Sequence, residues 1–367
     1  MSERIAAVHS VAVSLPAHPD LVVRGAKGAH DRSDFLLVRV TTSGGAQGYG
    51  EVSGTALWSG EDAVSARHFT HTVLAPALLG RPLAPVGALE AVMDRVLAGN
   101  PFTKAGLSTA LWDAHARVLG VPLAVALGGP YRDEVPIKLS LSGDGARLER
   151  AYAAAVAAGF GAFKVKVGLG VTGDLERVRL ARELAGPQAF LGTDANGGWN
   201  RAEAATAVRG LAGFGVAFAE QPLPPEDLAG MAALRAHGLP VVADESVFGT
   251  ADLTRVIRAE AADVVSLYVG KAGGPGRAVG MGAVARAFGL PVLIGSNGEL
   301  GLGAAAQLHV ACALPELSAF PSDIIGAHYY AEDILDTPLD SDGCRVRLGT
   351  GPGLGVRPRD DLRRRFR

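Results

Sequence analysis

Short apolar runs alternate with Ala-rich amphipathic stretches through the second half of the chain. The runs are rich in Val, Ile, Leu and Phe, and each ends in a polar residue or a turn. They are VPIKLSLS, AFKVKVG, QAFLGTDANGGW, VAFAEQP, PVVADES, DVVSLYVG and PVLIGSNGE. Strands that alternate with helices of this length form a parallel sheet. We count seven strands to residue 299 and expect LSAFPSD, residues 317–323, to be an eighth.

Five polar residues stand at the ends of successive runs. They are Lys166, Asp194, Glu220, Asp244 and Tyr268, separated by 28, 26, 24 and 24 residues. A stride of about 25 residues is the length of one strand, one helix and two short loops, so these residues fall at equivalent strand ends of a βα barrel. A doubly wound sheet would gather its binding groups at one switch point instead. The repeat therefore favours a closed barrel.

The first part of the chain has a different pattern. Residues 4–53 have the alternation of strands broken by turns, and residues 61–127 have the periodicity of helices that end at a Gly-Gly pair. Between the first strands, residues 16–33 form a polar loop that is too irregular for a helix and is placed to fold over a pocket. We expect three parts: an N-terminal domain over residues 1–125, a catalytic barrel over 126–323 and a C-terminal segment, 324–367, that packs back on the first domain.

Composition narrows the class of partner. The 367 residues include 35 Lys and Arg against 37 Asp and Glu, so no net field attracts nucleic acid or an anionic membrane. The two cysteines, Cys312 and Cys344, lack metal-ligand spacing, and the amino terminus lacks the apolar core of a secretion signal. We therefore expect a cytoplasmic protein whose partner is a small molecule.

Asp194, Glu220 and Asp244 imply a bound cation. Each follows three or more mainly apolar or small residues, in TDANGGW, AEQP and ADES. One such acid is commonly a helix cap or a strand-end turn, but three in the same register are not. Three carboxylates at a barrel mouth repel one another unless a cation lies between them, and oxygen-only ligands suit Mg²⁺. We predict these three residues as magnesium ligands.

Two lysines precede the acids by one βα unit. In FKVKV, Lys164 and Lys166 are two residues apart, so both side chains lie on one face of the strand. A solvated edge strand alternates in the same way, but in a barrel the polar face is the lumen. Two ammonium groups beside a divalent cation depress each other's pKa, which would leave one lysine neutral and able to accept a proton. Lys166, nearer the carboxyl end of the strand, is the predicted base.

These parts suggest a reaction class. A metal that binds a substrate carboxylate stabilises the enediolate that forms when a neighbouring base removes the α-proton, as in enolase-superfamily sites. The chain resembles the mandelate racemase/muconate lactonizing enzyme family of that superfamily, in its muconate-lactonizing subgroup. The motifs that carry the resemblance are STALWDAHARVLGVPLAVALGG, KVKVG, TDANGGW, AEQP, ADES, KAGGPG and ELGLGAAAQLH. Several are degenerate alone, but their order and spacing are specific.

The resemblance implies an α/β fold, a modified TIM barrel (β/α)7β with an α+β capping domain made from both termini. It implies Mg²⁺ at the three carboxylates, Lys166 as the acid/base on one face of the substrate and Lys164 in support. Loops of the cap, here residues 16–33 and 50–53, would close the pocket over a small carboxylic acid. Such proteins are commonly homo-oligomers.

Tyr268 departs from the family pattern. The second acid/base lysine of the family should fall here, in a pattern like K-x-x-K-x-G-G, and this chain has YVGKAGG. A racemase needs a base on each face of the α-carbon, and a phenol, with an unperturbed pKa of about 10, is a poor base but a serviceable acid. We therefore expect a lyase, such as a dehydratase working by β-elimination, or a cycloisomerase. The alternatives are a racemase or epimerase of an amino-acid or hydroxy-acid derivative, and an inactive metal-dependent relative that only binds a small acid.

Further residues are expected around the site. Asn196 and Glu245 lie in the motifs of the metal ligands and would support them. Lys271, past the strand end or on its opposite face, is expected to be structural. Glu299 stands where the family often places an acid in contact with substrate or a lysine, although a solvated turn acid is the other interpretation. His309, in the helix AAAQLHVACAL, is expected in the core.

Overall fold

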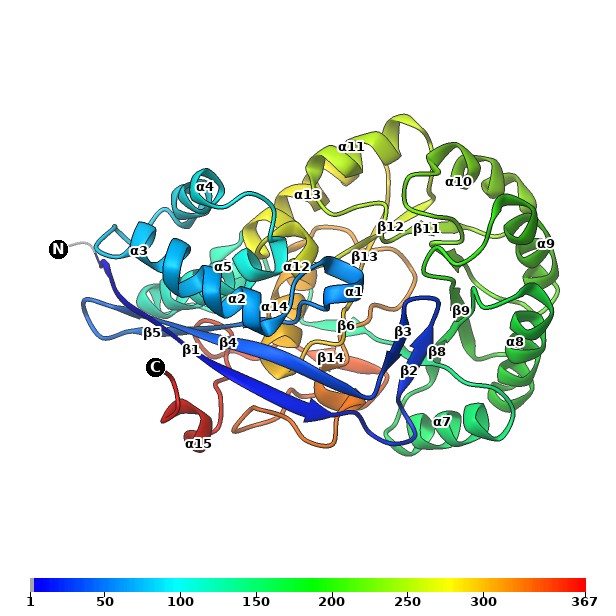
Figure 1. Ribbon diagram of the computed structural model, residues 1–367, viewed down its shortest axis with the longest axis horizontal. Helices are drawn as coiled ribbons and strands as arrows, with labels where there is room; N and C mark the ends of the chain where they lie inside the picture. Colours follow the sequence, from blue (N-terminus) through cyan, green and yellow to red (C-terminus); the bar gives the residue numbers. More distant parts are fainter. Residues whose placement is uncertain (1–2) are drawn as a thin grey trace.

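A computed structural model describes residues 3–367, and for His30 the backbone only. A small antiparallel sheet with its helices lies at one end, and a ring of alternating strands and helices lies at the other (Figure 1). The described chain begins at residue 3 and ends at residue 367 on the side of the small sheet (Figure 1). Within the described residues, no helix is both long and apolar enough to cross a membrane.

The small sheet pairs antiparallel in the order β1 (Ile5–Pro16), β4 (Arg32–Thr42) and β5 (Gln47–Val52). Helix α5 (Pro101–Leu119) packs on β5, and a Cβ at Gly50 would lie 2.0 Å from the carbonyl oxygen of Gly106. This close approach of helix and strand requires a glycine at position 50. The other helices of this part are α1 (Ala56–Ser59), α2 (Ala63–Phe69), η1 (Thr70–Leu74), α3 (Ala75–Leu78), α4 (Val86–Val96) and α6 (Leu123–Ala126). The predicted strands over residues 4–53 and helices over 61–127 are confirmed.

The polar loop of residues 16–33 contains a hairpin. Its arms are β2 (Val23–Gly25) and β3 (Gly28–His30), which pair antiparallel with Gly25 opposite Gly28. The prediction that this stretch forms no helix is confirmed, but the hairpin was not predicted. Two glycines around a two-residue turn permit a tight hairpin despite the surrounding charges. The hairpin lies beside β8 (Ala162–Lys166) at the mouth of the barrel (Figure 1).

Seven parallel strands form the barrel sheet, and chain neighbours are spatial neighbours at every step. They are β7 (Leu139–Leu141), β8, β9 (Phe190–Asp194), β10 (Ala219–Glu220), β11 (Val241–Ala243), β12 (Val264–Leu267) and β13 (Val292–Ile294). The helices are α7 (Ala146–Ala157), α8 (Val171–Ala185), α9 (Arg201–Ala212), α10 (Leu228–Leu234), η2 (Arg235–His237), α11 (Thr250–Arg258), α12 (Val269–Ala272), α13 (Pro275–Ala287) and α14 (Gly301–Ala313). This order excludes a doubly wound sheet. The fold is a modified TIM barrel (β/α)7β with an α+β capping domain.

The expected eighth strand closes the barrel without becoming a regular strand. Asp323 N donates to Ile294 O at 2.7 Å on one side, and Lys138 N donates to Ser322 O at 3.0 Å on the other. Residues 317–323 thus take the eighth place in the ring, but their prediction as a full strand is wrong. The reason is Pro321, which has no N–H to give to a ladder.

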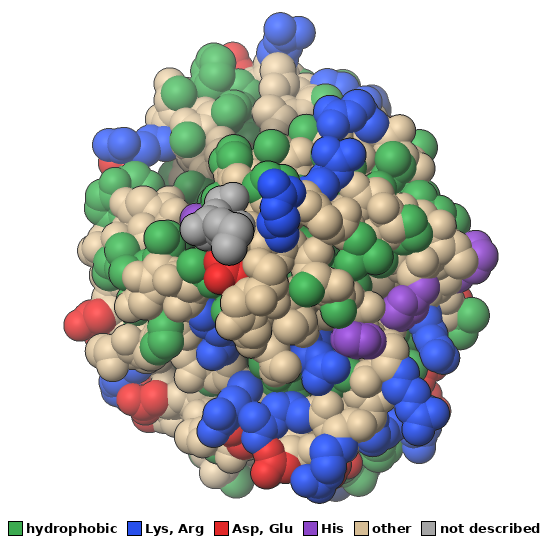
Figure 2. Space-filling view, turned by 90° about the vertical axis from the view of Figure 1, so that its left-hand side faces the viewer, with side chains coloured by type: hydrophobic (Ala, Val, Ile, Leu, Met, Phe, Trp, Pro, Cys, Tyr) green, Lys and Arg blue, Asp and Glu red, His purple; other side chains and the backbone are tan. Residues whose placement is uncertain are grey.

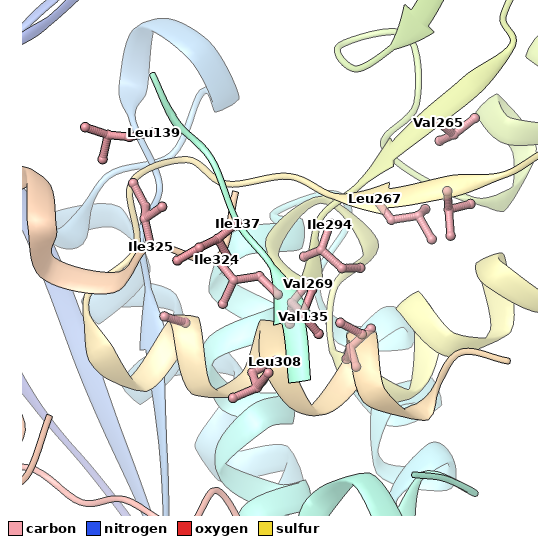
Figure 3. Close-up of a cluster of buried hydrophobic side chains, with 14 of the residues drawn as sticks. Val135, Ile137, Leu139, Val265, Leu267, Val269, Ile294, Leu308, Ile324 and Ile325 are labelled. Carbon is pink, nitrogen blue, oxygen red and sulfur yellow. The ribbon is translucent and has the colours of Figure 1, made fainter. Parts of the chain in front are cut away.

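The first predicted strand of the barrel is divided. Its first part, β6 (Glu134–Pro136), pairs antiparallel with β14 (Arg345–Arg347) outside the barrel, and only β7 joins the barrel sheet. Apolar side chains from both sides of the closure, including Ile137, Ile294 and Ile324, pack over Leu308 of α14 (Figure 3). This packing seals the barrel where its strand pairing is weakest.

The lumen of the barrel has an apolar floor. Phe218, Val242, Val264 and Leu293 form a buried cluster separate from the main core. A Cβ at position 192 of β9 would lie 2.3 Å from the ring of Phe218, so the floor is filled by side chains. We call these four residues the floor cluster.

The end of the chain returns to the small sheet after η3 (Gly326–Tyr329) and α15 (Asp360–Arg363). Backbone hydrogen bonds of 3.0 and 3.3 Å join Ser10 to Arg367. The face on this side of the molecule carries many Lys and Arg side chains and fewer Asp and Glu (Figure 2). The domain boundaries at residues 125 and 323 stay predictions.

His309 lies in α14 with 2 % of its surface exposed. Its Nδ1 accepts a hydrogen bond from Ala124 N at 3.0 Å, and burial lowers its pKa to about 4. The prediction of a core histidine is confirmed. Cys312, in the same helix, is buried and Cys344 is exposed, and both are free thiols.

Candidate active site

Lys164 and Lys166 both point into the lumen at the carboxyl end of β8. Phe163 and Val165 beside them belong to the main core outside the barrel, so the alternation predicted from the sequence is confirmed. The Lys164 side chain is 4 % exposed and that of Lys166 is 13 % exposed. Lys166 is therefore the amine with more access to the cavity above it.

Asp194 and Glu220 surround these amines. Lys164 Nζ lies 3.2 Å from both carboxylate oxygens of Glu220 and 3.7 Å from Asp194 Oδ2. Lys166 Nζ donates to the same Asp194 oxygen at 2.7 Å. Asp244, one strand further on, is bonded instead to the hydroxyl of Tyr268 at 2.9 Å. All three acids are at most 1 % exposed, so these contacts occur out of water.

Negative charge is in excess at this mouth. Burial, and after it the carboxylates of Asp194 and Asp244, raise the pKa of Glu220 to about 8 despite the adjacent lysine. Burial and Asp244 likewise raise the pKa of Glu245 to about 7. Among the described residues, Oε2 of Glu245 is buried without a hydrogen-bond partner. The site thus has more carboxylates than its lysines neutralise, and these carboxylates are available to bind a cation.

The donor set is of the kind that Mg²⁺ takes, since hard divalent ions prefer carboxylate oxygens. Asp194, Glu220 and Asp244 are the residues that would hold it. Over residues 3–367, no group of three or more His, Cys, Asp or Glu side chains is arranged as metal ligands are. The three carboxylates are held by lysine and tyrosine partners, so the magnesium ligands stay a prediction supported by donor chemistry and excess charge.

Both lysines favour the protonated form in this environment. Burial lowers their pKa values, but Asp323 and Glu220 raise that of Lys164 more strongly, and Asp194 raises that of Lys166, so both lie above the ordinary value. The expectation of one neutral lysine refers to the site with a cation beside the amines, and it stays a prediction. Among the side chains alone, the attraction of the surrounding carboxylates outweighs the repulsion between the two amines.

Tyr268 follows β12 on the opposite side of the cavity and is 4 % exposed. Its hydroxyl donates to Asp244 Oδ2, and its ring stacks on Trp58 with centroids 5.6 Å apart and planes 20° apart. Burial and the Asp244 carboxylate raise its pKa well above the ordinary value. The phenol is therefore an oriented hydrogen-bond donor and a poor base.

Lys271 lies past the strand end, in α12. Its ammonium donates to Asp244 Oδ1 at 2.5 Å, to Asp244 O at 2.7 Å and to Ser266 O at 3.0 Å. Three acceptors hold this group, which is 2 % exposed. These contacts orient Asp244 and leave the amine no access to the cavity.

Asn196 connects the base to Glu245. Its Oδ1 accepts from Lys166 at 3.0 Å, and its Nδ2 donates to Glu245 Oε1 at 2.9 Å. The same oxygen accepts from Trp58 Nε1 at 3.0 Å. Sequence reasoning missed Trp58, because a single Trp in a four-residue helix of the cap has no pattern that indicates a site.

A second buried ion pair behind Lys164 was also missed. Asp323 Oδ2 accepts from Lys164 at 3.1 Å and from Lys138 at 3.0 Å, and Lys138 is fully buried. Lys138 also donates to Pro321 O at 2.6 Å. The rule that found the other acids, a carboxylate at the end of an apolar run, would also have found Asp323.

Glu299 is buried, and its hydrogen-bond partners are not the lysine amines of the site. Its carboxylate accepts hydrogen bonds from Ser53, Ser296, Asn297 and Gln307. Within the described residues these partners include no lysine, so both the contact with a lysine and the solvated turn are wrong. Residues 50–53 end β5 beneath the site, and Trp58 lines the cavity in their place.

A cavity of about 100 Å³ separates the base from the hairpin above it. Lys166, Asn196 and Tyr268 line it from the barrel, and Gly25 and Lys27 line it from the hairpin. A Cβ at Gly25 would lie 3.2 Å from Asn196 Oδ1 and 3.7 Å from Lys166 Cδ. The prediction that residues 16–33 fold over a pocket is confirmed.

Two family models match the chain. The mandelate racemase / muconate lactonizing enzyme N-terminal domain matches residues 6–128, and the enolase C-terminal domain-like model matches residues 147–362. The chain belongs to the mandelate racemase / muconate lactonizing enzyme family. Muconate cycloisomerase 1 of Rhodococcus opacus is 37 % identical over 329 residues, 88 % of each chain. L-Ala-D/L-Glu epimerase of Bacillus subtilis is 33 % identical over 329 residues, 88 % of this chain and 89 % of the relative.

The crystal structure of muconate lactonizing enzyme from Pseudomonas fluorescens, complexed with muconolactone, superposes with a TM-score of 0.93. The two chains are 28 % identical, and each is covered completely. Within the mandelate racemase / muconate lactonizing enzyme family, this chain is an enzyme of the lyase or isomerase type. Tyr268 makes the two sides of the site unequal, with an amine on one side and a phenol on the other.

Proposed function

We propose that this enzyme is Mg²⁺-dependent and removes the proton α to a substrate carboxylate on one face only, with Lys166 as the base. The product would arise by β-elimination or cycloisomerisation of a small carboxylic acid. The observation that supports this proposal is the asymmetry of the cavity, with the Lys166 amine on one side and the Asp244-bound phenol of Tyr268 on the other.

Lys166 must lose its own proton before it can act as a base. The contact with Asp194 opposes this loss, because a carboxylate 2.7 Å away stabilises the ammonium form. When bound at the three carboxylates, Mg²⁺ would supply the positive charge that a substrate carboxylate needs. With Asp194 so engaged, the pKa of Lys166 would fall, and the amine would become able to accept the α-proton.

The same lysine can complete the reaction. After it takes the α-proton, its ammonium can give that proton to a β-leaving group on the same face of the substrate, so that one lysine acts as base and then acid. In a dehydration the leaving group departs as water. In the reverse direction of a cycloisomerisation, in which a lactone ring opens, the leaving group is the ring carboxylate, which departs as a carboxylic acid.

Tyr268 would orient the substrate from the other face. Its hydroxyl position is set by Asp244 and its ring by Trp58, so the donor is held before the substrate arrives. With a pKa above its ordinary value, the phenol keeps its proton near neutral pH. A hydrogen bond to the substrate or to the departing group is the role that this environment supports.

Racemisation or epimerisation is the second candidate, and similarity to the L-Ala-D/L-Glu epimerase favours it. It would need Tyr268 as the second base, because Lys271 is held by three acceptors outside the cavity. Similarity to the Rhodococcus opacus muconate cycloisomerase favours the one-base outcome instead.

The proposal is tested by a substrate screen in D₂O. Sugar acids, hydroxyprolines, amino acids, dipeptides and muconates are incubated with the enzyme and Mg²⁺ and are then examined by NMR and mass spectrometry. We expect deuterium at the α-carbon with retained configuration, together with loss of water or lactone formation from one class. Complete scrambling of the α-configuration without elimination would contradict the proposal, and absence of exchange from every class would favour a binding protein.

A further inference from the structure

A second, much smaller cavity lies between the capping domain and the barrel. Its volume is about 20 Å³, which accommodates one water-sized occupant. Glu51 lines it from the end of β5, and Glu299 and Gln307 line it from the barrel. None of these three side chains lines the cavity that contains Lys166. It is therefore a separate place in the fold.

Two carboxylates share this small space. A Cβ at Gly303, in the first turn of α14, would lie 3.2 Å from Glu51 Oε1 and 2.6 Å from Glu299 Cβ, so both glutamates stand beside the same glycine. They are 7 % and 6 % exposed. Glu51 accepts hydrogen bonds from the backbone of Leu300 at 2.7 Å and of Gly303 at 2.9 Å. These neutral donors orient its carboxylate but do not neutralise it.

The charge of this pair is not balanced by a basic side chain. Through residues 3–367, neither glutamate forms an ion pair with Lys, Arg or His, and every hydrogen bond that Glu299 accepts comes from a hydroxyl, an amide or a backbone N–H. Burial raises the pKa of Glu51 to about 8, and Glu299 adds to the increase. Two buried carboxylates without a counter-charge are costly, so the cavity favours a positively charged occupant.

Gln307 gives independent evidence of an occupant. Its Nε2 donates to Glu299 Oε2 at 2.8 Å and to Gly295 O at 3.1 Å, which fixes the orientation of the amide. Its Oε1 is buried and has no hydrogen-bond partner in the part of the chain that the structure describes. Gln307 is 1 % exposed, so bulk water does not reach this oxygen. Gln307 lines the cavity, so this amide oxygen is available as a ligand for an occupant.

We propose that this cavity binds one monovalent alkali cation, Na⁺ or K⁺, between Glu51, Glu299 and Gln307. Carboxylate and amide oxygens are the hard ligands that such ions take, and one positive charge offsets one of the two carboxylates. A magnesium ion keeps several waters, for which this volume has no room. A water molecule would satisfy Gln307 but would leave the charge unbalanced. Because Glu51 belongs to the cap, the ion would fasten the cap to the barrel.

The test is thermal unfolding of the full-length enzyme in NaCl, KCl or choline chloride at equal ionic strength, with constant Mg²⁺ and a pH above 8. We expect a saturable rise in Tm of about 2 °C at ten times the dissociation constant in Na⁺ or K⁺. The ion that saturates at the lower concentration is the resident one. Equal Tm values in the three salts at all concentrations would overturn the proposal.

Variants separate this site from general salt effects. Glu51→Gln removes a charge and Gln307→Leu removes the free oxygen, and each is expected to weaken the cation response at least about tenfold. The matched control is Glu61→Gln. Glu61 is another buried carboxylate of the cap that accepts from the start of a helix, at Phe102 N and Thr103 N. The Glu61→Gln variant should keep the full rise in Tm with Na⁺ or K⁺. An equal loss of this rise in all three variants would contradict the proposed cation site.

Diffraction gives a readout that does not depend on the folding of any variant. Crystals of the wild-type enzyme soaked in Rb⁺ or Tl⁺ should show an anomalous peak between Glu51, Glu299 and Gln307. Density for a water alone, with no anomalous peak in either soak, would overturn the proposal.

Discussion

The barrel lumen contains two layers of opposite chemistry on the same strands. The floor cluster is apolar and fully packed, with Phe218 and Val242 as members. Two residues further along, on the same face of the same strands, Glu220 and Asp244 begin the charged mouth. The floor stabilises the fold through burial, whereas the mouth retains buried charge that costs stability. At β10 and at the end of β11, two residues separate the side chain that stabilises the fold from the one that serves the chemistry.

The two sides of the barrel mouth, at β8 and after β12, also differ in the groups that they offer to a substrate. The amines of β8 stand among more carboxylates than they can neutralise, and Lys166 has the most access to the cavity. On the other side, the Tyr268 hydroxyl and the Lys271 ammonium are both bonded to Asp244. Of these two sides of the barrel mouth, the β8 side offers the Lys166 amine to a substrate and the β12 side offers the Tyr268 phenol. Variants can test this difference and the difference between floor and mouth.

Lys166→Met should have the largest effect. Without the amine, α-proton exchange is expected to fall by about 10³-fold, in the range that removal of a general base causes. The measurement is the rate of α-deuterium incorporation with a substrate from the screen. Lys27→Met is the control, because Lys27 lines the same cavity from the hairpin. Similar losses in both variants would mean that charge at the cavity matters and the base does not.

Phe218→Ala tests the floor. Removing a fully buried ring from a packed cluster should lower the free energy of unfolding by about 3–5 kcal/mol. The rate per folded molecule should change far less than in Lys166→Met. Urea unfolding followed by circular dichroism measures the first quantity, and deuterium exchange below the transition measures the second. A loss of rate as large as that of Lys166→Met would show that floor and mouth are not separable.

Lys138→Met tests the boundary between the layers, where the Lys138 ammonium lies 5.7 Å from the Phe218 ring centroid and bonds to Asp323. Removing one partner of a buried pair should cost about 3 kcal/mol of unfolding free energy. Adding Asp323→Asn should recover part of this loss, because the buried carboxylate left with Lys164 as its one remaining lysine partner is then gone. Equal stability of the single variant and the wild type would show that Lys164 alone neutralises Asp323.

Tyr268→Phe should have the smallest effect on the first step. The ring still stacks on Trp58 while the hydroxyl is lost, so α-deuterium exchange should persist and product formation should fall by about 10²-fold. Comparing the two rates in one NMR experiment checks this. If exchange and product formation fall together, Tyr268 takes part in proton removal. In Tyr268→Lys, a second amine on this side of the cavity should add α-deuterium exchange with inversion of configuration at the α-carbon.

Much of this site follows from strand periodicity. The regular spacing of strand-end residues predicted that Asp194, Glu220 and Asp244 lie together at the barrel mouth. The alternation in FKVKV predicted that both lysines point into the lumen. Both predictions succeed because spacing and alternation depend only on local strand geometry. The hairpin in residues 16–33 was not predicted, because it depends on turn glycines within an otherwise irregular sequence. Residues 317–323 were predicted as a regular strand, but Pro321 interrupts the strand pairing there.

The remaining misses come from contacts between distant segments. Trp58 reaches Glu245 across 187 positions, and Lys138 reaches Asp323 across 185. Glu299 was expected to contact substrate or a lysine, or to be a solvated turn acid, and its hydrogen-bond donors in the structure include Ser53 and Gln307. The pKa values of the two lysines likewise depend on how many carboxylates the fold gathers around them. Pattern alone does not give that number.

The central claim, that proton chemistry occurs on one face only, is tested most directly by the stereochemistry of exchange. The substrate found in the D₂O screen is recovered early in the reaction, and the configuration and deuterium content of its α-carbon are measured together. The account predicts deuterated substrate of unchanged configuration beside the elimination or cycloisomerisation product. Deuterated substrate of inverted configuration, formed by the wild type as fast as the retained form, would contradict it and make Tyr268 a second base.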